Sequence, residues 1–327
     1  MPELRVGVMG CSSFARRAML PALKECDGLK LVAIASRSQQ KAREFATEFD
    51  ALPVHGYEEL VKRDDIDAIY MPLPTGLHEQ WIVSCIEAGK HLLVEKSFAE
   101  SAKSAEKMAR LASDKKVFVQ ENFLFPNHSQ WTWITDVVKS GKLGDIHLVR
   151  STFGFPPLPR DNFRFNASLG GGVLLDAGAY VLKVSQLLLG FDLEVNGSSL
   201  QYDKELAVDI YGQAMLQNSA GQVSQVAFGF NYFYQCNLEI LGTKGKLTAD
   251  RIFTPPPGFN PTVTLESQGE KDVKSLEADN HYVNMWNNFA AGIEKDNYKK
   301  SLSEILSQAQ LIEQLKNKAV VNTSSCF

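Results

Sequence analysis

The stretch that decides the fold reads Leu4-Arg5-Val6-Gly7-Val8-Met9-Gly10-Cys11-Ser12-Ser13-Phe14-Ala15. An apolar run predicts a strand, which leads through G-x-S-x-x-A, a relaxed form of G-x-G-x-x-G, into a helical pattern. Gly10 permits a tight turn, Ser12 is small enough for backbone to approach a pyrophosphate, and small Ala15 lets the helix pack close to the strand. We expect the phosphates of a dinucleotide to meet Gly10, Cys11, Ser12, Ser13, Phe14 and Ala15 at this helix N-terminus. The alternative is a tight turn that binds nothing.

Outward from this stretch, short apolar runs alternate with helical patterns. The expected strands lie at 4–9, 29–35, 68–71, 91–94 and 117–120, and the expected helices at 14–26, 39–49, 77–88 and about 101–113. Repeated β-α-β units with near-continuous apolar strands predict a doubly wound parallel sheet covered on both faces. The placement of the glycine turn at the first strand-to-helix junction favours the nucleotide-binding interpretation.

The pattern changes near Glu121. The expected helices are 131–140, 173–189, 281–293 and 302–319, the expected strands are 146–153, 207–217, 222–232, 237–241 and 246–249, and a proline-rich loop covers 155–164. Consecutive strands with short turns indicate antiparallel pairing, so this half is an α+β domain. The fold class is therefore α/β plus α+β, with a Rossmann domain at 1–121 and a second, α+β domain at 122–327.

Composition narrows the function classes. The chain has 327 residues and a formal net charge of −4, with no basic block, so nothing suggests nucleic acid or an anionic membrane as a partner. The start lacks the pattern of a secretory signal, and the apolar runs are too short to span a bilayer. Five scattered cysteines argue against a disulfide framework or a metal site and fit the reducing cytoplasm.

The end of the second expected strand bears on cofactor choice. It reads Ala35-Ser36-Arg37-Ser38, where an NAD-specific site would carry an acidic residue for the ribose 2′-hydroxyl. Ser36, Arg37 and Ser38 instead offer donors and a positive charge to a 2′-phosphate. NADP(H) is therefore favoured over NAD(H), against the alternative that Arg37 is a solvated residue at the start of a helix.

Candidate catalytic residues occur in both halves. Lys96 follows an expected strand, at the carboxyl edge where open α/β sheets bind ligands, although a lysine there is often only solvated or ion-paired. In the second half, Asp176 and Tyr180 would share one helix face, and Gly178 would admit close approach of a ligand. A buried Asp176 needs a partner, which a catalytic lysine could supply. The alternatives are a helix N-terminal charge for Asp176 and a core aromatic for Tyr180.

The run from the Gly10 turn through Glu95-Lys96 to Asp176-x-Gly178-x-Tyr180 resembles the glucose-fructose oxidoreductase/inositol dehydrogenase (Gfo/Idh/MocA) family along essentially the whole chain. Within it, the likeness is to sugar-nucleotide 3-ketoreductases of deoxysugar biosynthesis. That likeness lies in Glu121-Asn122-Phe123, Phe155-Pro156-Pro157, Phe163-Arg164 and Arg251-Ile252-Phe253-Thr254-Pro255-Pro256. The resemblance implies a large, mostly antiparallel second sheet that often joins subunits, hence a homodimer or homotetramer. It also implies that Lys96 and Tyr180 are the catalytic pair.

Three residues depart from the family pattern. Ser97 stands where proline usually follows the lysine, Lys183 where many members have a neutral or acidic residue, and Ser12 where they have glycine or alanine. Of these, Ser97 bears most on the loop beside the nicotinamide.

The expected reaction moves hydride between nicotinamide C4 and a sugar ring carbon, with a proton from Tyr180 or Lys96, while Asp176 and Glu95 hold the pair. Further cofactor contacts are expected from Pro72, Leu73, His78, Glu95, Lys96 and Asn122. Substrate contacts are expected from Arg160, Arg164, Asn122 and Tyr180, with a structural salt bridge as the alternative for each arginine. Other functions on this scaffold are a sugar, polyol or dihydrodiol dehydrogenase, a non-catalytic nucleotide-sensing regulator, and a glycosidase that uses NAD transiently. The presence of Lys96 disfavours the regulator, and the Ser-Arg-Ser strand end disfavours the NAD-dependent glycosidase.

Overall fold

The computed structural model describes residues 3–326, which pack into two compact units. The first runs to Asn122 and also takes in Tyr282–Leu306, and the second contains Phe123–His281 and the chain from Ser307 onward. The sequence analysis had assigned 282–306 to the second domain. This segment joins the first unit because helix α8 (His281–Glu294) carries large aromatic side chains that pack there. Trp286 Nε1 donates to the Met19 carbonyl at 2.9 Å, and the Phe289 ring lies 5.7 Å from that of Phe118.

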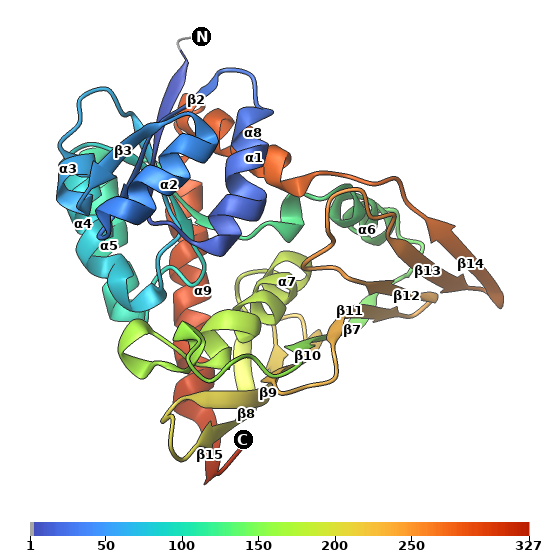
Figure 1. Ribbon diagram of the computed structural model, residues 1–327. Coiled ribbons are helices and arrows are strands. Elements are labelled where there is room, and N and C mark those ends of the chain that lie inside the picture. The colour runs from blue at the N-terminus through green and yellow to red at the C-terminus, as the bar shows by residue number, and fades with distance from the viewer. Residues whose placement is uncertain (1–2, 327) are drawn as a thin grey trace. The chain divides into compact units, whose positions relative to one another are not determined.

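The first unit, whose strands β2 and β3 are labelled in blue in Figure 1, is built on a six-stranded, wholly parallel sheet in the order β3-β2-β1-β4-β5-β6. Its strands are β1 (Leu4–Met9), β2 (Leu29–Ser36), β3 (Leu52–His55), β4 (Ala68–Met71), β5 (His91–Glu95) and β6 (Val119–Asn122). The predicted parallel sheet is confirmed, and its order is that of a dinucleotide-binding fold. Strand β4 is buried along its whole length, as expected for a central parallel strand.

The helices of this unit lie close to their predicted bounds. They are a π turn η1 (Ala15–Met19), α1 (Leu20–Lys24), α2 (Gln39–Phe49), α3 (Tyr57–Val61), η2 (Thr75–Leu77), α4 (His78–Glu87) and α5 (Ala102–Lys115). The sequence analysis missed β3 and α3. Three of the four residues of β3 are exposed, including Pro53, so this edge strand carries almost no apolar signal.

The second unit is built on a nine-stranded sheet in the order β14-β13-β12-β11-β7-β10-β9-β8-β15. Its strands are β7 (Ile146–Phe155), β8 (Glu194–Asp203), β9 (Asp209–Gln217), β10 (Val223–Phe230), β11 (Gln235–Gly242), β12 (Gly245–Asp250), β13 (Thr262–Ser267), β14 (Glu270–Ser275) and β15 (Ala319–Ser324). The pairs β10–β7 and β15–β8 are parallel and the others antiparallel, which confirms the predicted mostly antiparallel sheet. Strands β8, β13, β14 and β15 had no separate prediction; β14 is exposed throughout and so lacks an apolar pattern.

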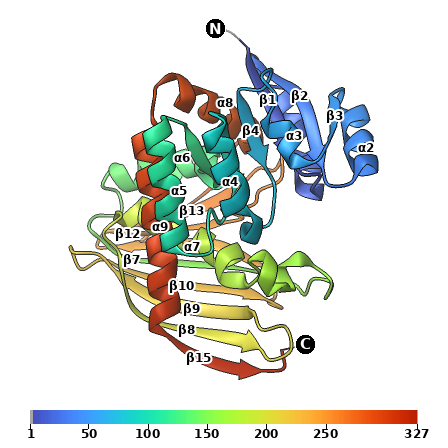
Figure 2. The ribbon, with the colours of Figure 1, turned by 90° about the vertical axis from the view of Figure 1, so that its left-hand side faces the viewer.

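Helices lie on one face of this sheet (Figure 2). They are η3 (Phe125–Asn127), α6 (Ser129–Lys139), η4 (Phe163–Phe165), η5 (Ala167–Leu169), the π turn η6 (Leu174–Gly178), α7 (Ala179–Leu189) and the C-terminal half of α9 (Tyr298–Lys318). Along β10, Val226, Phe228 and Phe230 are buried, whereas Gln225 on the other face is exposed. The sheet therefore has a covered apolar face and an open face.

One helical stretch requires a correction to the sequence analysis. Ala167–Leu189 is long and apolar enough to cross a membrane by composition, with a mean hydropathy of 1.4 over its apolar window. However, 78% of that window is buried inside the protein, where it forms the core beneath the large sheet. Its apolar character is accounted for by this packing.

Candidate active site

The glycine turn after β1 has the conformation that the sequence predicted. Gly10 has a φ of +122°, and a Cβ there would lie 2.9 Å from Leu73 Cδ2, so both backbone angle and space require glycine. The Ser12 hydroxyl accepts from the Ala15 amide at 3.0 Å, and Ala15 is completely buried. Ser12 therefore caps the helix as well as being small. Cys11, Ser13 and Phe14 complete the turn between β1 and the π turn η1.

At the end of β2, two serine hydroxyls shape the turn that carries Arg37. Ser36 Oγ accepts from the Ser38 amide at 3.1 Å, and Ser38 Oγ accepts from the Lys41 amide at 3.4 Å as the N-cap of α2. A hydroxyl that accepts a hydrogen bond keeps its own proton free to donate. Arg37 itself is exposed. The turn therefore carries two serine hydroxyls and a guanidinium, which also interacts with the Tyr57 hydroxyl.

The side chain of His78 holds the loop that follows β4. His78 is fully buried, and its Nδ1 and Nε2 lie 3.1 Å and 2.9 Å from the carbonyl oxygens of Phe98 and Leu73. Burial lowers the pKa of His78, so the ring is neutral and donates to one of the two carbonyls. Leu73, next to Pro72, packs against Gly10. The ring of His78, expected to contact the cofactor, therefore joins the loops that follow β4 and β5.

A buried polar cluster lies at the carboxyl edge of the sheet. Glu95 Oε1 accepts from the Tyr70 hydroxyl and from Asn122 Nδ2, both at 2.7 Å, so the ends of β4, β5 and β6 are tied together. Burial raises the pKa of the Glu95 carboxyl. The sequence analysis missed Tyr70, although a tyrosine within a buried apolar strand signals a hydroxyl that needs a partner.

Two residues at this edge of the sheet, Asn122 of the cluster and Lys96 beside it, are candidates for contact with the cofactor. Asn122 is completely buried, and its Oδ1 has no hydrogen-bond partner, so an acceptor is left for a donor such as a carboxamide N–H. Lys96 follows Glu95 directly and is partly exposed, and the Lys96–Ser97 peptide bond is cis. Lys96 thus occupies the predicted place after β5.

In the second unit, Asp176 is paired with Arg164. Arg164 Nε donates to Asp176 Oδ2 at 2.6 Å, and the Asp176 side chain is 14% exposed. The sequence analysis had expected a catalytic lysine as the partner of Asp176 and substrate as the partner of Arg164. Arg160 lies 3.3 Å from Glu205, and both side chains are exposed. Each arginine therefore has an acidic neighbour within its own unit.

Tyr180 is the second residue of α7, two residues beyond the π turn that carries Asp176. Its ring packs against those of Phe123, Phe153 and Phe253 at 5.4, 5.2 and 5.5 Å, and it is 8% exposed. The predicted helix is confirmed, but its first turn is π rather than α. Tyr180 therefore has the packing of a core aromatic in addition to any chemical role of its hydroxyl.

Two further expectations concern the same helix. Gly178 was expected to admit a ligand, but a Cβ there would lie 3.0 Å from Leu174 Cδ1 and 3.3 Å from the Phe228 ring, so the glycine lets the helix pack on the sheet. Lys183, the departure noted in the sequence, is buried, with its Nζ 5.7 Å from the ring centroid of Phe123 and 5.5 Å from that of Phe191. Both are packing features of the second unit. Among residues 3–326, no group of three potential metal ligands is present.

Comparison with known proteins identifies the family. The oxidoreductase family with an NAD-binding Rossmann fold matches residues 4–123, and the GFO/IDH/MocA C-terminal domain matches residues 131–248. The chain belongs to the Gfo/Idh/MocA oxidoreductase family. The Gfo/Idh/MocA architecture, a Rossmann domain followed by a large open sheet, is the one described above, and it makes this protein an oxidoreductase.

Two Gfo/Idh/MocA relatives are named dTDP-3,4-didehydro-2,6-dideoxy-alpha-D-glucose 3-reductase. The protein from Saccharopolyspora spinosa is 39% identical over 84% of this chain and 83% of its own, and the one from Actinomadura kijaniata is 36% identical over 97% and 96%. A solved 3-ketoreductase from Actinomadura kijaniata, in complex with NADP and TDP-benzene, superposes with a TM-score of 0.95. It is 35% identical and covers 99% of this chain and 100% of its own.

Proposed function

We propose that this protein is an NADP(H)-dependent ketoreductase that reduces the 3-keto group of a nucleotide-linked deoxysugar. The proposal rests on two residues, Lys96 directly after β5 in the first unit and Tyr180 near the start of α7 in the second. Structures of the solved Actinomadura kijaniata relative include variants of a lysine and of a tyrosine. These two residues are separated by the same number of positions as Lys96 and Tyr180 here. The ketone that would be reduced is the 3-keto group of the dTDP-linked didehydro sugar for which the two relatives are named.

The residues present suit an NADP(H) cofactor. Gly10 has the positive φ that suits the tight turn of a pyrophosphate-binding loop, and the buried Asn122 Oδ1 offers an unused acceptor to the nicotinamide carboxamide. Ser36, Arg37 and Ser38 offer donors and charge to the 2′-phosphate. When bound, the cofactor supplies the hydride. We propose Pro72, Leu73 and Glu95 as the remaining lining of the site, with His78 supporting it from beneath.

The protein's own groups handle the proton. Reduction places negative charge on the carbonyl oxygen of the substrate, which then takes a proton from the Tyr180 hydroxyl or the Lys96 ammonium group. A phenol with a pKa near 10 is a weak acid at neutral pH, so a lysine cation beside it makes proton transfer easier. Asp176 holds Arg164, and we propose that Arg164, with Arg160 and Asn122, faces the substrate, the arginines on the side of its diphosphate.

The test is single-turnover oxidation of NADPH by a panel of 3-keto and 4-keto nucleotide sugars, with NADH run in parallel. We expect rapid turnover of a dTDP-linked 3-ketosugar with NADPH. Turnover of free polyols or dihydrodiols alone would favour the dehydrogenase alternative. Cofactor binding without turnover of any carbonyl substrate would refute the proposal.

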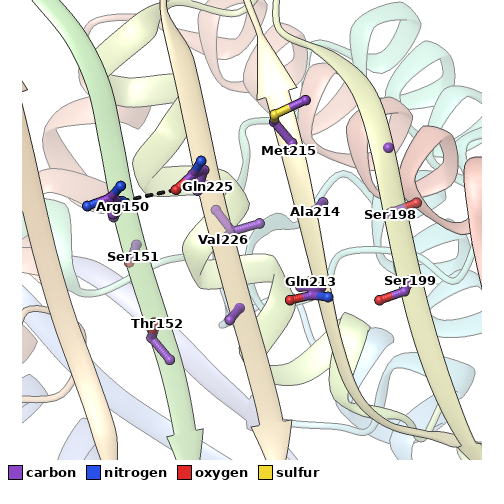
Figure 3. Close-up of a pocket in the computed structure, with 12 residues that line it drawn as sticks. Arg150, Ser151, Thr152, Ser198, Ser199, Gln213, Ala214, Met215, Gln225 and Val226 are labelled. Atoms are coloured by element: carbon purple, nitrogen blue, oxygen red, sulfur yellow. Dashed lines mark hydrogen bonds between the residues drawn. The ribbon is translucent and has the colours of Figure 1, made fainter.

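We propose further that the enzyme is a homo-oligomer joined through the open face of the nine-stranded sheet. Arg150, Gln213, Met215 and Gln225 project from this face around a shallow hollow of about 540 Å³ (Figure 3). Tyr211 and Met215 are 42% and 43% exposed there. A broad face on which Tyr211, Met215 and neutral polar side chains surround Arg150, itself paired with Glu239, suits a second copy of itself across a two-fold axis. The five free cysteines are consistent with a cytoplasmic location, which we also propose.

A further inference from the structure

The helix that carries Asp176 and Tyr180 begins with an uncommon turn. The π turn Leu174–Gly178 precedes the regular helix α7, and both follow the glycine run 170–172. Single π turns in α-helices occur frequently at functional sites. A π turn changes the direction of the side chains that follow it, so the groups that hold it determine where Asp176 and Tyr180 point.

Asp209, the first residue of β9, holds the beginning of this turn. Its Oδ2 accepts from the Leu174 amide at 2.6 Å, and the side chain is only 7% exposed. Gly172 makes room for it, because a Cβ at that position would overlap Asp209 Oδ1. Asp209 thus performs the task of an N-cap residue, although it comes from a strand 35 residues further along the chain.

Gln308, in α9, holds the other end of the turn. Its Nε2 donates to the Ala179 carbonyl at 2.8 Å, and its side chain is 1% exposed. Ala179 directly precedes Tyr180. Hydrogen bonds from side chains of β9 and α9 therefore hold the π turn at Leu174 and at Ala179. Asp176, which forms the ion pair with Arg164, lies between these two positions in the chain.

We propose that Asp209 and Gln308 are positioning residues for the reduction: they hold the π turn so that Asp176 and Tyr180 are aimed at the reacting groups. This inference rests on the proposed function. The reasoning is geometric, because a displacement of about 1 Å at a reacting group is enough to cost ~10²-fold in rate. Loss of either hydrogen bond frees one end of the segment 174–179, which carries Asp176 and directly precedes Tyr180.

The experiment compares Asp209→Ala, which removes the acceptor for the Leu174 amide, and Gln308→Met with a matched control, Asp203→Ala. Asp203 is another buried aspartate of the same sheet, and its Oδ1 accepts from the amides of Glu205 and Leu206 at 2.9 Å each. Three quantities are measured: the single-turnover rate with NADPH and a keto nucleotide sugar, the NADPH Kd, and amide hydrogen exchange over 174–180. Gln308→Met keeps the length of the side chain and removes the donor, so it provides a second variant if Asp209→Ala folds poorly.

We expect both test variants to react ~10-fold or more slowly and to exchange faster over 174–180, with an NADPH Kd within about two-fold of wild type. The control should keep its rate within about two-fold. Faster exchange with an unchanged rate would overturn the positioning role, and so would unchanged exchange. A wild-type protein that reduces no keto sugar would instead overturn the proposed function, so the two failures are distinguishable.

Discussion

Replacement of Tyr180 by phenylalanine separates the chemical role of this residue from its packing. The ring lies against those of Phe123, Phe153 and Phe253, and Tyr180→Phe keeps every one of these contacts. Only the hydroxyl is lost, so the free energy of unfolding should fall by no more than about 0.5–1.5 kcal/mol, the usual contribution of one hydrogen bond. If the hydroxyl donates the proton, the single-turnover rate should fall ~10²-fold or more, equivalent to about 2.7 kcal/mol in the activation barrier.

The assay is single-turnover oxidation of NADPH by a keto nucleotide sugar, with thermal unfolding and NADPH affinity measured separately. NADPH affinity should be unchanged, because the phosphates are expected to bind in the first unit. Tyr232→Phe is the matched control, since Tyr232 is a half-buried tyrosine of the same unit packed over Gly154 and Gly229. Turnover of Tyr180→Phe within a few-fold of wild type would make Tyr180 a packing residue and leave Lys96 as the acid. Lys96→Ala should also lose ~10²-fold in rate, and full activity in both variants would refute the assignment of the active site.

Three further predictions follow from the same structure. Wild type should bind NADPH more tightly than NADH. Arg37→Ala should lose that preference because the variant removes the guanidinium that we expect beside the 2′-phosphate. Fluorescence titrations that give equal affinities of wild type for the two cofactors would contradict this prediction. Light scattering at micromolar concentration should report a dimer or tetramer, and Met215→Lys on the open sheet face should lower that mass; a monomeric wild type would exclude the interface. Burial raises the pKa of the Asp209 carboxyl to about 6, although the nearby charge of Lys316 acts in the opposite direction. The protonated carboxyl therefore stabilises the folded state fully at pH values below 3.8, its pKa in the unfolded chain. This stabilisation is lost as the pH rises to about 6. Asp209→Asn should therefore melt at a higher Tm than wild type at pH 8, by the equivalent of about 3 kcal/mol at most, with the difference vanishing near pH 4; a variant that melts lower at pH 8 would contradict the sign.

The local pattern of the sequence was sufficient wherever an element carries its own signals. Helix α2 spans Gln39–Phe49 as predicted, because Ser38 caps it and its apolar residues recur on one face. The turn at Gly10 was predictable for the same reason, since a strand, a glycine with positive φ and a helix start are all written within a dozen residues. Lys96 could be placed because it follows a short apolar strand whose carboxyl end defines the ligand edge of the sheet.

Other features depended on contacts between residues far apart in the chain. Trp286 indicates that α8 has an apolar face, but the sequence does not show in which unit that face is buried. The tertiary packing places α8 in the first unit. The carboxylate of Asp176 signalled the need for a partner, and the folded chain places Arg164 beside it, a pairing that no local pattern indicated. Asp209 gave no signal in the sequence, since its contact exists only where β9 meets the π turn that precedes α7. The periodicity of apolar residues and the capping residues show which face of each segment is buried. The partner of a given side chain is decided by tertiary packing, because that packing brings together residues that are far apart in the sequence.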